Sequence, residues 1–173
     1  MREVSVHLRA MEPTDLDFLY QIENDSDIWD VGLTNVPYSR YTLHNYVATA
    51  SSDIFADRQV RLMIETAQQE LVGVVDLVNF DPRHLRAEVG LVILKNQRRK
   101  GYGSAAIAKM LDYARRICHL HQVYAVVDEQ NLASQKLFSG MGFQTTSELK
   151  NWLFDGENHR NALLMQFFLR KVT

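Results

Sequence analysis

Three basic residues and two glycines gather in the middle of the chain, in the stretch Arg98-Arg99-Lys100-Gly101-Tyr102-Gly103-Ser104. An apolar segment ending at Leu94 precedes this stretch, and an amphipathic segment from Ala105 to Leu120 follows it. A strand, a basic glycine-rich loop and a helix N-terminus in that order form an anion site, because free amides and the positive end of the helix dipole face the ligand. The sequence therefore predicts a site for a pyrophosphate, with further donors from the basic side chains.

The loop differs from the two commonest nucleotide-binding loops. The G-x-x-x-x-G-K-[ST] phosphate loop has wider spacing, and the dinucleotide fingerprint needs a third glycine where this chain has Ala106. The pattern Arg98-x-x-Gly101-x-Gly103 resembles instead the [QR]-x-x-G-x-[GA] segment of the GNAT superfamily of N-acetyltransferases. The resemblance implies acetyl-coenzyme A (acetyl-CoA) as co-substrate, held by its pyrophosphate. The alternative is an ordinary strand-to-helix turn with a solvated basic rim.

A second segment, from Val127 to Phe143, is similar to the second cofactor element of the same superfamily. The resemblance implies that Asn131 contacts the pantetheine arm. It also implies that the strand before the glycine loop is bulged and that its backbone binds pantetheine and the acetyl oxygen. The cofactor-binding residues expected on these grounds are Leu91, Val92, Ile93, Arg98, Arg99, Lys100, Gly101, Tyr102, Gly103, Ser104, Asn131 and Ser134.

Length and composition describe an ordinary globular protein of 173 residues, 46% hydrophobic and 23% charged. We expect residues 1–173 to form a single GNAT acetyltransferase domain. The net charge of −2 and the lack of a long apolar run argue against nucleic-acid and membrane partners. The single cysteine, Cys118, excludes an internal disulfide, and together with the absence of a signal-like start it favours a cytoplasmic location. No cluster of ligands has metal-site spacing, so no metal is expected.

Hydrophobic periodicity and turn residues predict the element order β-α-α-β-β-β-α-β-α-β-β. We expect strands at about Val4–Ala10, Gln59–Thr66, Leu71–Asp81, Ala87–Leu94, Val123–Asp128, Thr146–Phe154 and Ala162–Leu169. Helices are expected after Pro13, from about Ser39, from Ala105 to Leu120 and from Leu132 to Met141. The fold class is α/β (α+β): a GNAT fold with a mixed, mostly antiparallel sheet of about seven strands flanked by four helices. Helices after the fourth and fifth strands imply a parallel neighbour, and such a junction can splay into a cleft.

Glu88 is the candidate catalytic residue. It lies between the apolar residues Ala87 and Val89, where an unpaired carboxylate would be costly to bury. The resemblance implies a general base here, which deprotonates the incoming ammonium, often through water. Partial burial would raise the pKa of Glu88 toward that task. The alternative is an ion pair with Arg86 or Arg83.

Phe138 is the clearest departure from the resemblance, because the similar enzymes usually carry a tyrosine there whose hydroxyl protonates the departing thiolate of coenzyme A. Phenylalanine cannot donate a proton. A thiol with a pKa of about 8.5 is a tolerable leaving group without protonation, so transfer can survive with a lower rate. Water, Ser139 or Tyr102 are possible substitutes, and no general acid is assigned.

Acidic and aromatic side chains gather between residues 23 and 41, and this combination suits a cationic acceptor. Within the superfamily the likeness is greatest to spermidine and diamine N-acetyltransferases, carried by the segment from His84 to Glu88 and by the Asp155-Gly156 hairpin. The predicted substrate-binding residues are Asp76, Glu23, Asp27, Trp29 and Tyr38. The alternatives are a solvated acidic loop with its aromatics folded over the core and, for Asp76, an ion pair.

The leading hypothesis is therefore transfer of acetyl from acetyl-CoA to a primary amine, such as spermidine, by direct attack in a ternary complex. Enzymes that acetylate the N-terminal amine of ribosomal proteins share much of this layout and remain an alternative. A non-catalytic acyl-CoA binding or sensing module is a second alternative, and Phe138 favours it. Likeness to the spermidine enzymes also implies a possible homo-oligomer.

Overall fold

The structure is a computed structural model that describes residues 4–26 and 37–169. Seven strands form one sheet in the order β1-β2-β3-β4-β5-β7-β6. The strands are β1 (Val6–Arg9), β2 (Val60–Thr66), β3 (Leu71–Asp81), β4 (Arg86–Ile93), β5 (Gln122–Asp128), β6 (Gln144–Phe154) and β7 (His159–Phe168). The strand number and the mostly antiparallel pairing confirm the fold expected from the sequence.

The described residues contain five α-helices and two short 3₁₀ segments. The helices are α1 (Leu16–Glu23), α3 (Arg40–Thr49), α4 (Ile54–Asp57), α5 (Tyr102–Arg116) and α6 (Leu132–Gly140), with 3₁₀ turns at Pro13–Asp15 and Lys95–Gln97. The four expected helices are present, and α4 is an addition of one turn begun by the Asp53 side chain, which accepts from the Phe55 N–H at 2.9 Å. Four residues are too few to show a helical period, so the sequence analysis missed it.

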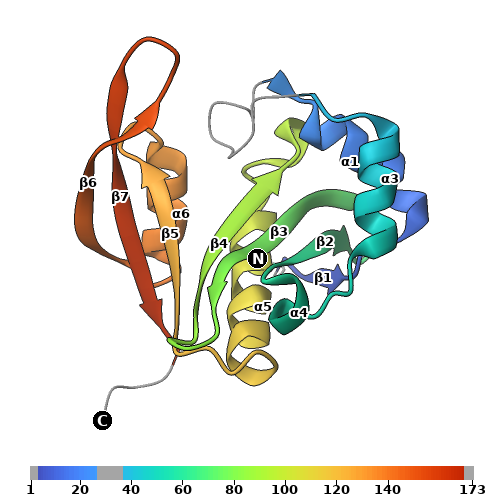
Figure 1. Cartoon of the computed structure of the whole chain (residues 1–173), viewed down its shortest axis with the longest axis horizontal. Coiled ribbons are helices and arrows are strands. Elements are labelled where there is room, and N and C mark those ends of the chain that lie inside the picture. The colour runs from blue at the N-terminus through green and yellow to red at the C-terminus, as the bar shows by residue number, and fades with distance from the viewer. Residues whose placement is uncertain (1–3, 27–36, 170–173) are drawn as a thin grey trace.

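Helices cover both faces of the sheet (Figure 1), and each face has its own apolar cluster. On one face, Leu19 and Ile22 of α1 and Leu43 of α3 pack against Met63 and Val74. On the other, the buried side of α5 and part of α6 pack against the alternate residues of the central strands. Alternation along each strand divides the side chains between the two clusters, so neighbouring residues serve different layers. No described helix is long and apolar enough to cross a membrane.

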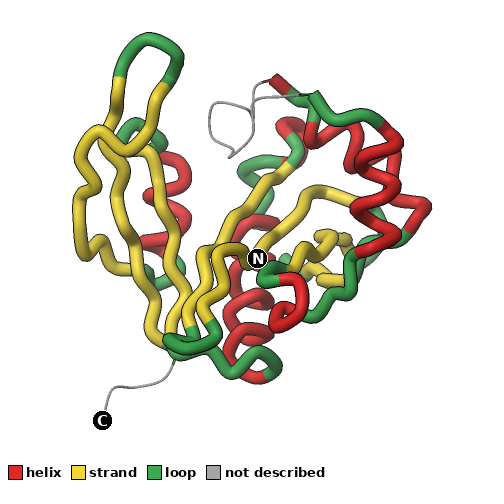
Figure 2. Tube along the Cα trace, in the orientation of Figure 1, coloured by secondary structure: helices red, strands yellow, loops and turns green. Residues whose placement is uncertain are grey.

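Strands β4 and β5 form a fork. They run parallel and pair over only three residues each, Arg86–Glu88 with Gln122–Tyr124, and then separate, as Figure 1 shows. The loops that follow the two strands, and lead into α5 and α6, lie at the open end of the fork (Figure 2). This confirms the predicted parallel pair and leaves the edge of Val89–Ile93 that faces β5 without a strand partner among the described residues.

The other edge of β4 pairs with β3 in a continuous register, from Gly73 opposite Ile93 to Val78 opposite Glu88. The family resemblance implied a bulge at residues 91–93. This prediction is wrong for the pairing of β4 with β3, which is regular there. The register shift lies on β3 instead, between Val78 and Asp81. Gly73 permits the close approach, since an added Cβ there would lie 2.1 Å from the carbonyl oxygen of Val92.

Candidate active site

The N-terminus of α5 has the geometry of an anion site. Its N-cap is Gly101, whose φ of 87° is left-handed and therefore favours glycine, and no side chain caps the helix. The amides of the first helical turn have no partner within the helix by construction. They remain available for a ligand at the positive end of a helix 15 residues long. The helix begins at Tyr102, so Gly103 and Ser104 belong to its first turn rather than to the loop.

The basic rim has partly internal contacts. Arg98 Nε donates to the carbonyl oxygen of Ile93 at 3.0 Å, which ties the loop to the end of β4. Lys100 Nζ donates to Gln97 Oε1 at 2.8 Å. Arg99 has a left-handed φ of 62°. All three side chains are on an exposed segment, so they can turn toward an anion at modest cost.

Gly103 allows α5 to approach the fork closely. A Cβ at this position would lie 3.3 Å from Leu91 Cδ2 and 3.5 Å from Leu137 Cδ2, which are on β4 and α6. The helix N-terminus therefore lies against both sides of the fork. Leu91 and Ile93 pack on the α5 side of the sheet and Val92 on the other side, so only their backbone is available to a ligand in the fork.

Asn131 and Ser134 meet at the start of α6. The Ser134 N–H donates to Asn131 Oδ1 at 3.0 Å, so Asn131 is the N-cap of this helix. Its oxygen is used by the cap, and its side-chain amide nitrogen is the group left for a contact with pantetheine. The sequence analysis assigned Asn131 only a ligand contact and missed its structural role.

Glu88 lies at the vertex of the fork, as the last residue of β4 that pairs with β5. Asn79 Nδ2 donates to Glu88 Oε2 at 2.8 Å. Burial raises the pKa of Glu88 above its usual value, while the Asn79 hydrogen bond and the nearby backbone N–H of Val126 oppose that rise. The alternative ion pair is not formed, since Arg86 pairs with Asp81 at 3.2 Å. Glu88 is therefore a half-buried carboxyl with a raised pKa, held at the point where the strands part.

A cluster of charges lies on the same face of the sheet as Glu88. Arg61 Nε and Nη2 donate to the two oxygens of Asp76, each at 2.8 Å, and Arg61 also pairs with Glu23 of α1. Burial disfavours the charge on Arg61, but Asp76 and Glu23 outweigh it, so the pKa of the guanidinium is raised. Asp76 lies opposite Gly90, two residues along β4 from Glu88. We call Glu23, Arg61 and Asp76 the Arg61 cluster.

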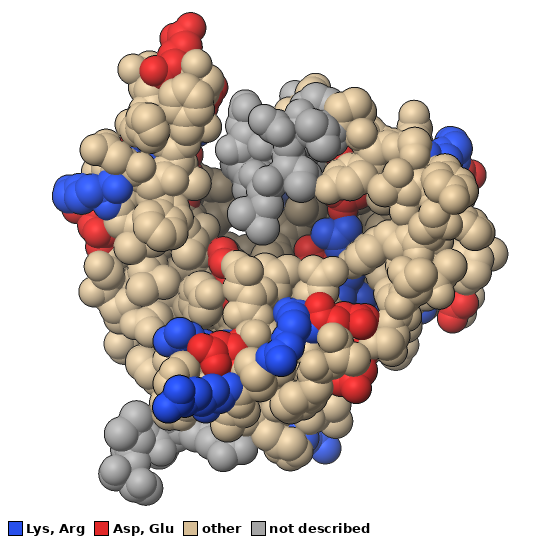
Figure 3. All heavy atoms as spheres, viewed as in Figure 1, with Lys and Arg blue, Asp and Glu red and all other residues tan. Residues whose placement is uncertain are grey.

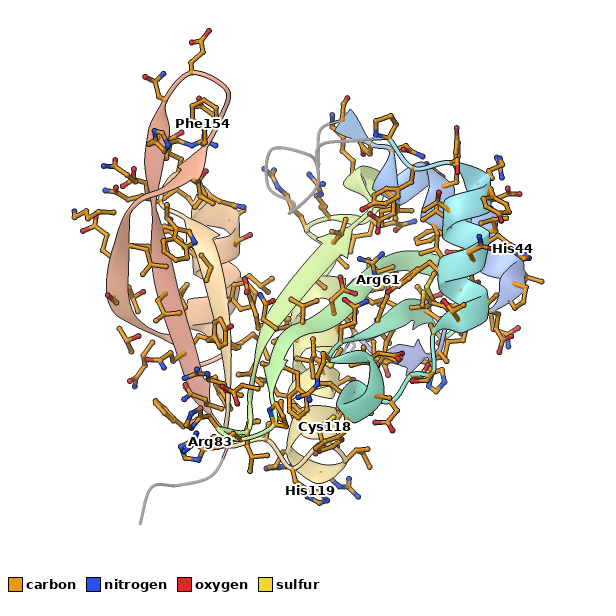
Figure 4. All side chains as sticks on the ribbon, viewed as in Figure 1. His44, Arg61, Arg83, Cys118, His119 and Phe154 are labelled. Atoms are coloured by element: carbon orange, nitrogen blue, oxygen red, sulfur yellow. The ribbon has the colours of Figure 1, made fainter. Side chains whose placement is uncertain are left out.

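Two predicted substrate ligands, Glu23 and Asp76, belong to the Arg61 cluster. Glu23 and Asp76 lie together because both pair with Arg61, and for Asp76 this is the ion pair that the sequence left open as the alternative. Figure 4 shows Arg61 over the sheet on the side of α3. The space-filling view of this face shows red and blue atoms side by side between the two halves of the molecule rather than a patch of one sign (Figure 3). Two carboxylates against one guanidinium leave a net negative charge there.

A cavity of about 240 Å³ lies beside the cluster, between α3, the segment after it and β2. Tyr46 forms part of its wall, with Arg61 5.9 Å from the ring centroid. Burial raises the pKa of the Tyr46 hydroxyl. From the sequence Tyr46 is expected only to pack, and Arg61 has no predicted role, because a lone arginine on a strand gives no local signal of its partners.

Of the three other predicted acceptor residues, only Tyr38 lies in the described part of the chain. Asp27 and Trp29 lie outside the described residues. Tyr38 packs partly buried against the α1–α3 cluster, and its backbone N–H and carbonyl both bond to the Asn24 side chain, at 2.7 and 3.0 Å. Asn24 thus joins the two sides of the segment that contains the acidic residues, a role that the sequence did not indicate.

Phe138 is 5% exposed and packs edge-on against Phe143 with ring centroids 5.0 Å apart. It therefore serves the core of the α5–α6 layer. No group of three or more metal-ligating side chains occurs in the described parts of the chain.

Comparison with known proteins agrees with this geometry. The sequence pattern of the acetyltransferase (GNAT) domain family matches residues 5–144. The chain belongs to this family. It is 27% identical over 168 residues to spermidine N(1)-acetyltransferase of Escherichia coli K12, and the aligned region covers 95% of this chain and 86% of that protein.

Solved structures give the same result. A spermidine N-acetyltransferase from Vibrio cholerae in complex with CoA and spermine superposes with a TM-score of 0.85 at 26% identity, covering 95% of this chain and 96% of the other. A dodecameric structure of a spermidine N-acetyltransferase from Vibrio cholerae superposes with a TM-score of 0.80 at 25% identity, covering 95% and 94%. The protein is an acetyl-CoA-dependent N-acetyltransferase.

Proposed function

We propose that the protein acetylates a primary amine of a polyamine or diamine, such as spermidine, by direct attack of the amine in a ternary complex. The relatives that act on spermidine, and the solved relative with CoA and spermine, support this acceptor class. The observation that carries the proposal is the position of Glu88, at the vertex of a fork whose open end leads to the free amides of α5 and on the face that carries the Arg61 cluster.

The chain offers a place for each part of acetyl-CoA, which supplies an activated acetyl group as a thioester. The first-turn amides of α5 and the basic side chains of Arg98, Arg99 and Lys100 suit the pyrophosphate. The unpaired edge of Val89–Ile93 and the amide nitrogen of Asn131 suit the polar groups of pantetheine. We assign the cofactor contacts to these groups.

Glu88 acts as the general base in this proposal. The acceptor arrives as an ammonium ion and must lose a proton before its lone pair can attack. Glu88 takes that proton, directly or through a water molecule, and its raised pKa makes it a better base than an ordinary glutamate. The nitrogen–carbon bond then forms as the carbon–sulfur bond breaks, and the second proton that the nitrogen loses passes to the departing sulfur, directly or through water. Because Phe138 has no hydroxyl, no side chain is assigned to protonate the leaving sulfur.

The Arg61 cluster supports a cationic acceptor. Its nearest member, Asp76, is on the neighbouring strand and on the same face, displaced from Glu88 by two residues, or roughly 7 Å along the strand. After Arg61 is counted, the cluster keeps one negative charge, which favours a second ammonium on the substrate. We therefore keep Glu23 and Asp76 as proposed substrate contacts. Arg61 weakens their attraction for a cation but does not remove it.

The test is a thiol-release assay with a panel of amines and mass spectrometry of the products. The panel contains spermidine, spermine, short diamines, an aminoglycoside and peptides with free N-termini. We expect the highest kcat/KM for a polyamine or diamine and a product heavier by one acetyl group. A preference for the peptides would replace this acceptor with a protein N-terminus. Saturable cofactor binding without release from any amine would favour the sensing module.

We further propose that the protein self-associates, with residues 1–173 acting as one domain. A solved relative is dodecameric. The exposed aromatic side chains Trp152, Phe154 and Phe168 on strands β6 and β7, which end the sheet, support this. Sedimentation velocity at assay concentration should give a species larger than the 20.0 kDa chain. A single monomeric species would contradict the proposal. The cytoplasmic location remains a prediction from the sequence.

A further inference from the structure

Asn79 occupies an irregular position on β3. Its φ of 51° is left-handed, which asparagine tolerates better than most residues, and it lies within the register shift between Val78 and Asp81. The neighbouring Phe80 is 5% exposed and packs against Phe55, with centroids 5.0 Å apart. The irregularity is therefore fixed in place by the core rather than by the Asn79 side chain.

The shift changes the face on which Asn79 acts. Val78 is the register partner of Glu88, so the two side chains share a face of the sheet. In a regular strand the next residue would point to the opposite face. The left-handed turn instead brings Asn79 Nδ2 to within 2.8 Å of Glu88 Oε2. A β-bulge that redirects a side chain is a recurrent feature beside active sites.

The contact limits how the Glu88 carboxylate can turn. A carboxylate has about four acceptor positions, and Asn79 Nδ2 of β3 takes one of them. The backbone N–H of Val126 on β5 lies near enough to favour the charged carboxylate as well. The remaining positions are free for an ammonium or a water molecule. Asn79 is itself exposed, so the contact borders the space from which an acceptor would arrive.

We infer that Asn79 is a positioning residue for Glu88, which holds the carboxylate in the orientation needed to accept the proton of the incoming ammonium. This inference rests on the proposed function, in which Glu88 is the base. It assigns a reaction role to a residue outside the cofactor motifs, at a left-handed, non-glycine position of β3.

Other titratable groups surround Glu88 and set the background for a pH experiment. Tyr124 of β5 is its register partner. Burial raises the pKa of Tyr124, and the charge of the nearby Glu88 also raises it, to a smaller degree. Asp76 on β3 lies two residues along from Val78, the register partner of Glu88, and is paired with Arg61. Arg86 and Asp81 pair with each other toward the closed end of the fork. All four keep their charges and partners when Asn79 alone is changed.

The test uses Asn79→Gly, which keeps the left-handed backbone and removes the amide, and Asn79→Asp, which keeps the shape and places a carboxylate against Glu88. Asn151→Gly is the matched control, because Asn151 has a φ of 50° in the irregular part of β6. Glu88→Gln identifies the Glu88 carboxyl signal in a ¹³C NMR titration of the free protein and the acidic limb of the pH–kcat/KM profile.

Loss of the Asn79 donor should raise the pKa of Glu88. For Asn79→Gly we expect the NMR titration and the acidic limb to move upward by about one pH unit. We also expect kcat to fall by about tenfold, because the carboxylate is no longer oriented, with KM for acetyl-CoA unchanged. Asn79→Asp should move both further upward, because like charges oppose ionisation. Asn151→Gly should move neither.

An Asn79→Gly protein whose Glu88 titration and kcat match those of Asn151→Gly would overturn the inference, as would an acidic limb that survives in Glu88→Gln. The NMR titration does not depend on turnover. A wild-type protein that acetylates no amine would therefore refute the proposed function while the Asn79 contact is still measured.

Discussion

The first turn of α5 and the Arg61 cluster lie toward opposite faces of the same sheet and are built differently. The α5 site consists of backbone amides and basic side chains from one continuous stretch, residues 98–104. The Arg61 cluster consists of three side chains from α1, β2 and β3, joined over 38 and 15 residues of sequence. A main-chain site depends on backbone conformation, whereas a side-chain cluster depends on every charge in it.

Glu88 lies at the vertex of the fork that opens toward α5, and on the face of the sheet that carries the Arg61 cluster. Its substitution should have the largest effect. Glu88→Gln keeps the size of the side chain and removes the base, so kcat should fall by about 10²- to 10⁴-fold. The loss should be greatest at low pH, where the amine is protonated. Thiol release across pH measures this, and calorimetry with CoA should show unchanged affinity. A loss of CoA binding with no change in kcat would assign Glu88 to structure.

Removal of the shared cation should destabilise the acceptor face. Arg61→Met removes the guanidinium that pairs with Glu23 and Asp76, whose side chains are 19% and 17% exposed. Because the group is not fully buried, we expect the free energy of unfolding to fall by about 2–4 kcal/mol, somewhat less than for a fully buried pair. Denaturant unfolding measures it.

The control for Arg61 is Arg40→Met. Arg40 pairs with Asp17 at the surface, where the two side chains are 55% and 85% exposed. Its loss should change the free energy of unfolding by less than about 1 kcal/mol. Equal effects for Arg40 and Arg61 would mean that the Arg61 cluster contributes no more than a surface ion pair.

The cofactor loop should respond through its backbone. Gly101→Asp places a side chain and a negative charge at a left-handed position, with the new Cβ 3.2 Å from Val4 Cγ2. We expect CoA affinity to fall at least about tenfold, equivalent to about 1.4 kcal/mol. Gly156→Asp is the matched control, because Gly156 has a φ of 102° in an open turn of the β6–β7 hairpin. Calorimetry that gives equal affinities for the two variants would remove the loop from the cofactor site.

The smallest effect should come from a single rim charge. Lys100→Gln should weaken CoA binding by about two- to fivefold at low salt and less at high salt, as expected for an exposed charge. Lys109→Gln, at an exposed position within α5, should leave binding unchanged. If both lysines had the same effect, general attraction rather than a local contact would be the cause.

The two regions also differ in how far the sequence predicts them. The loop from Arg98 to Ser104 is local, so its glycine spacing and its place before an amphipathic helix identify it. Glu88 is identifiable because a carboxylate interrupts an apolar strand. The element order and the parallel pair of β4 and β5 likewise follow from periodicity and connection length.

The sequence does not predict which side chains interact with these residues. The sequence suggested Glu23 and Asp76 as substrate ligands, with an ion pair as the alternative for Asp76, but it did not indicate Arg61 as the partner of both. The register of β2 and β3 places Arg61 opposite Asp76. Asn79 reaches Glu88 only through a register shift, which no local pattern announces. Contacts of this kind depend on strand register and on packing between distant elements, so propensity and spacing do not determine them.

A crystal structure of the protein with CoA tests the central claim most directly. We predict the pyrophosphate within hydrogen-bond distance of the amides of residues 102–104. Pantetheine should run along the unpaired edge of Val89–Ile93, and the sulfur should lie on the side of the fork where Glu88 is held. Pyrophosphate density away from the N-terminus of α5, with the fork between β4 and β5 filled only by water, would contradict the account.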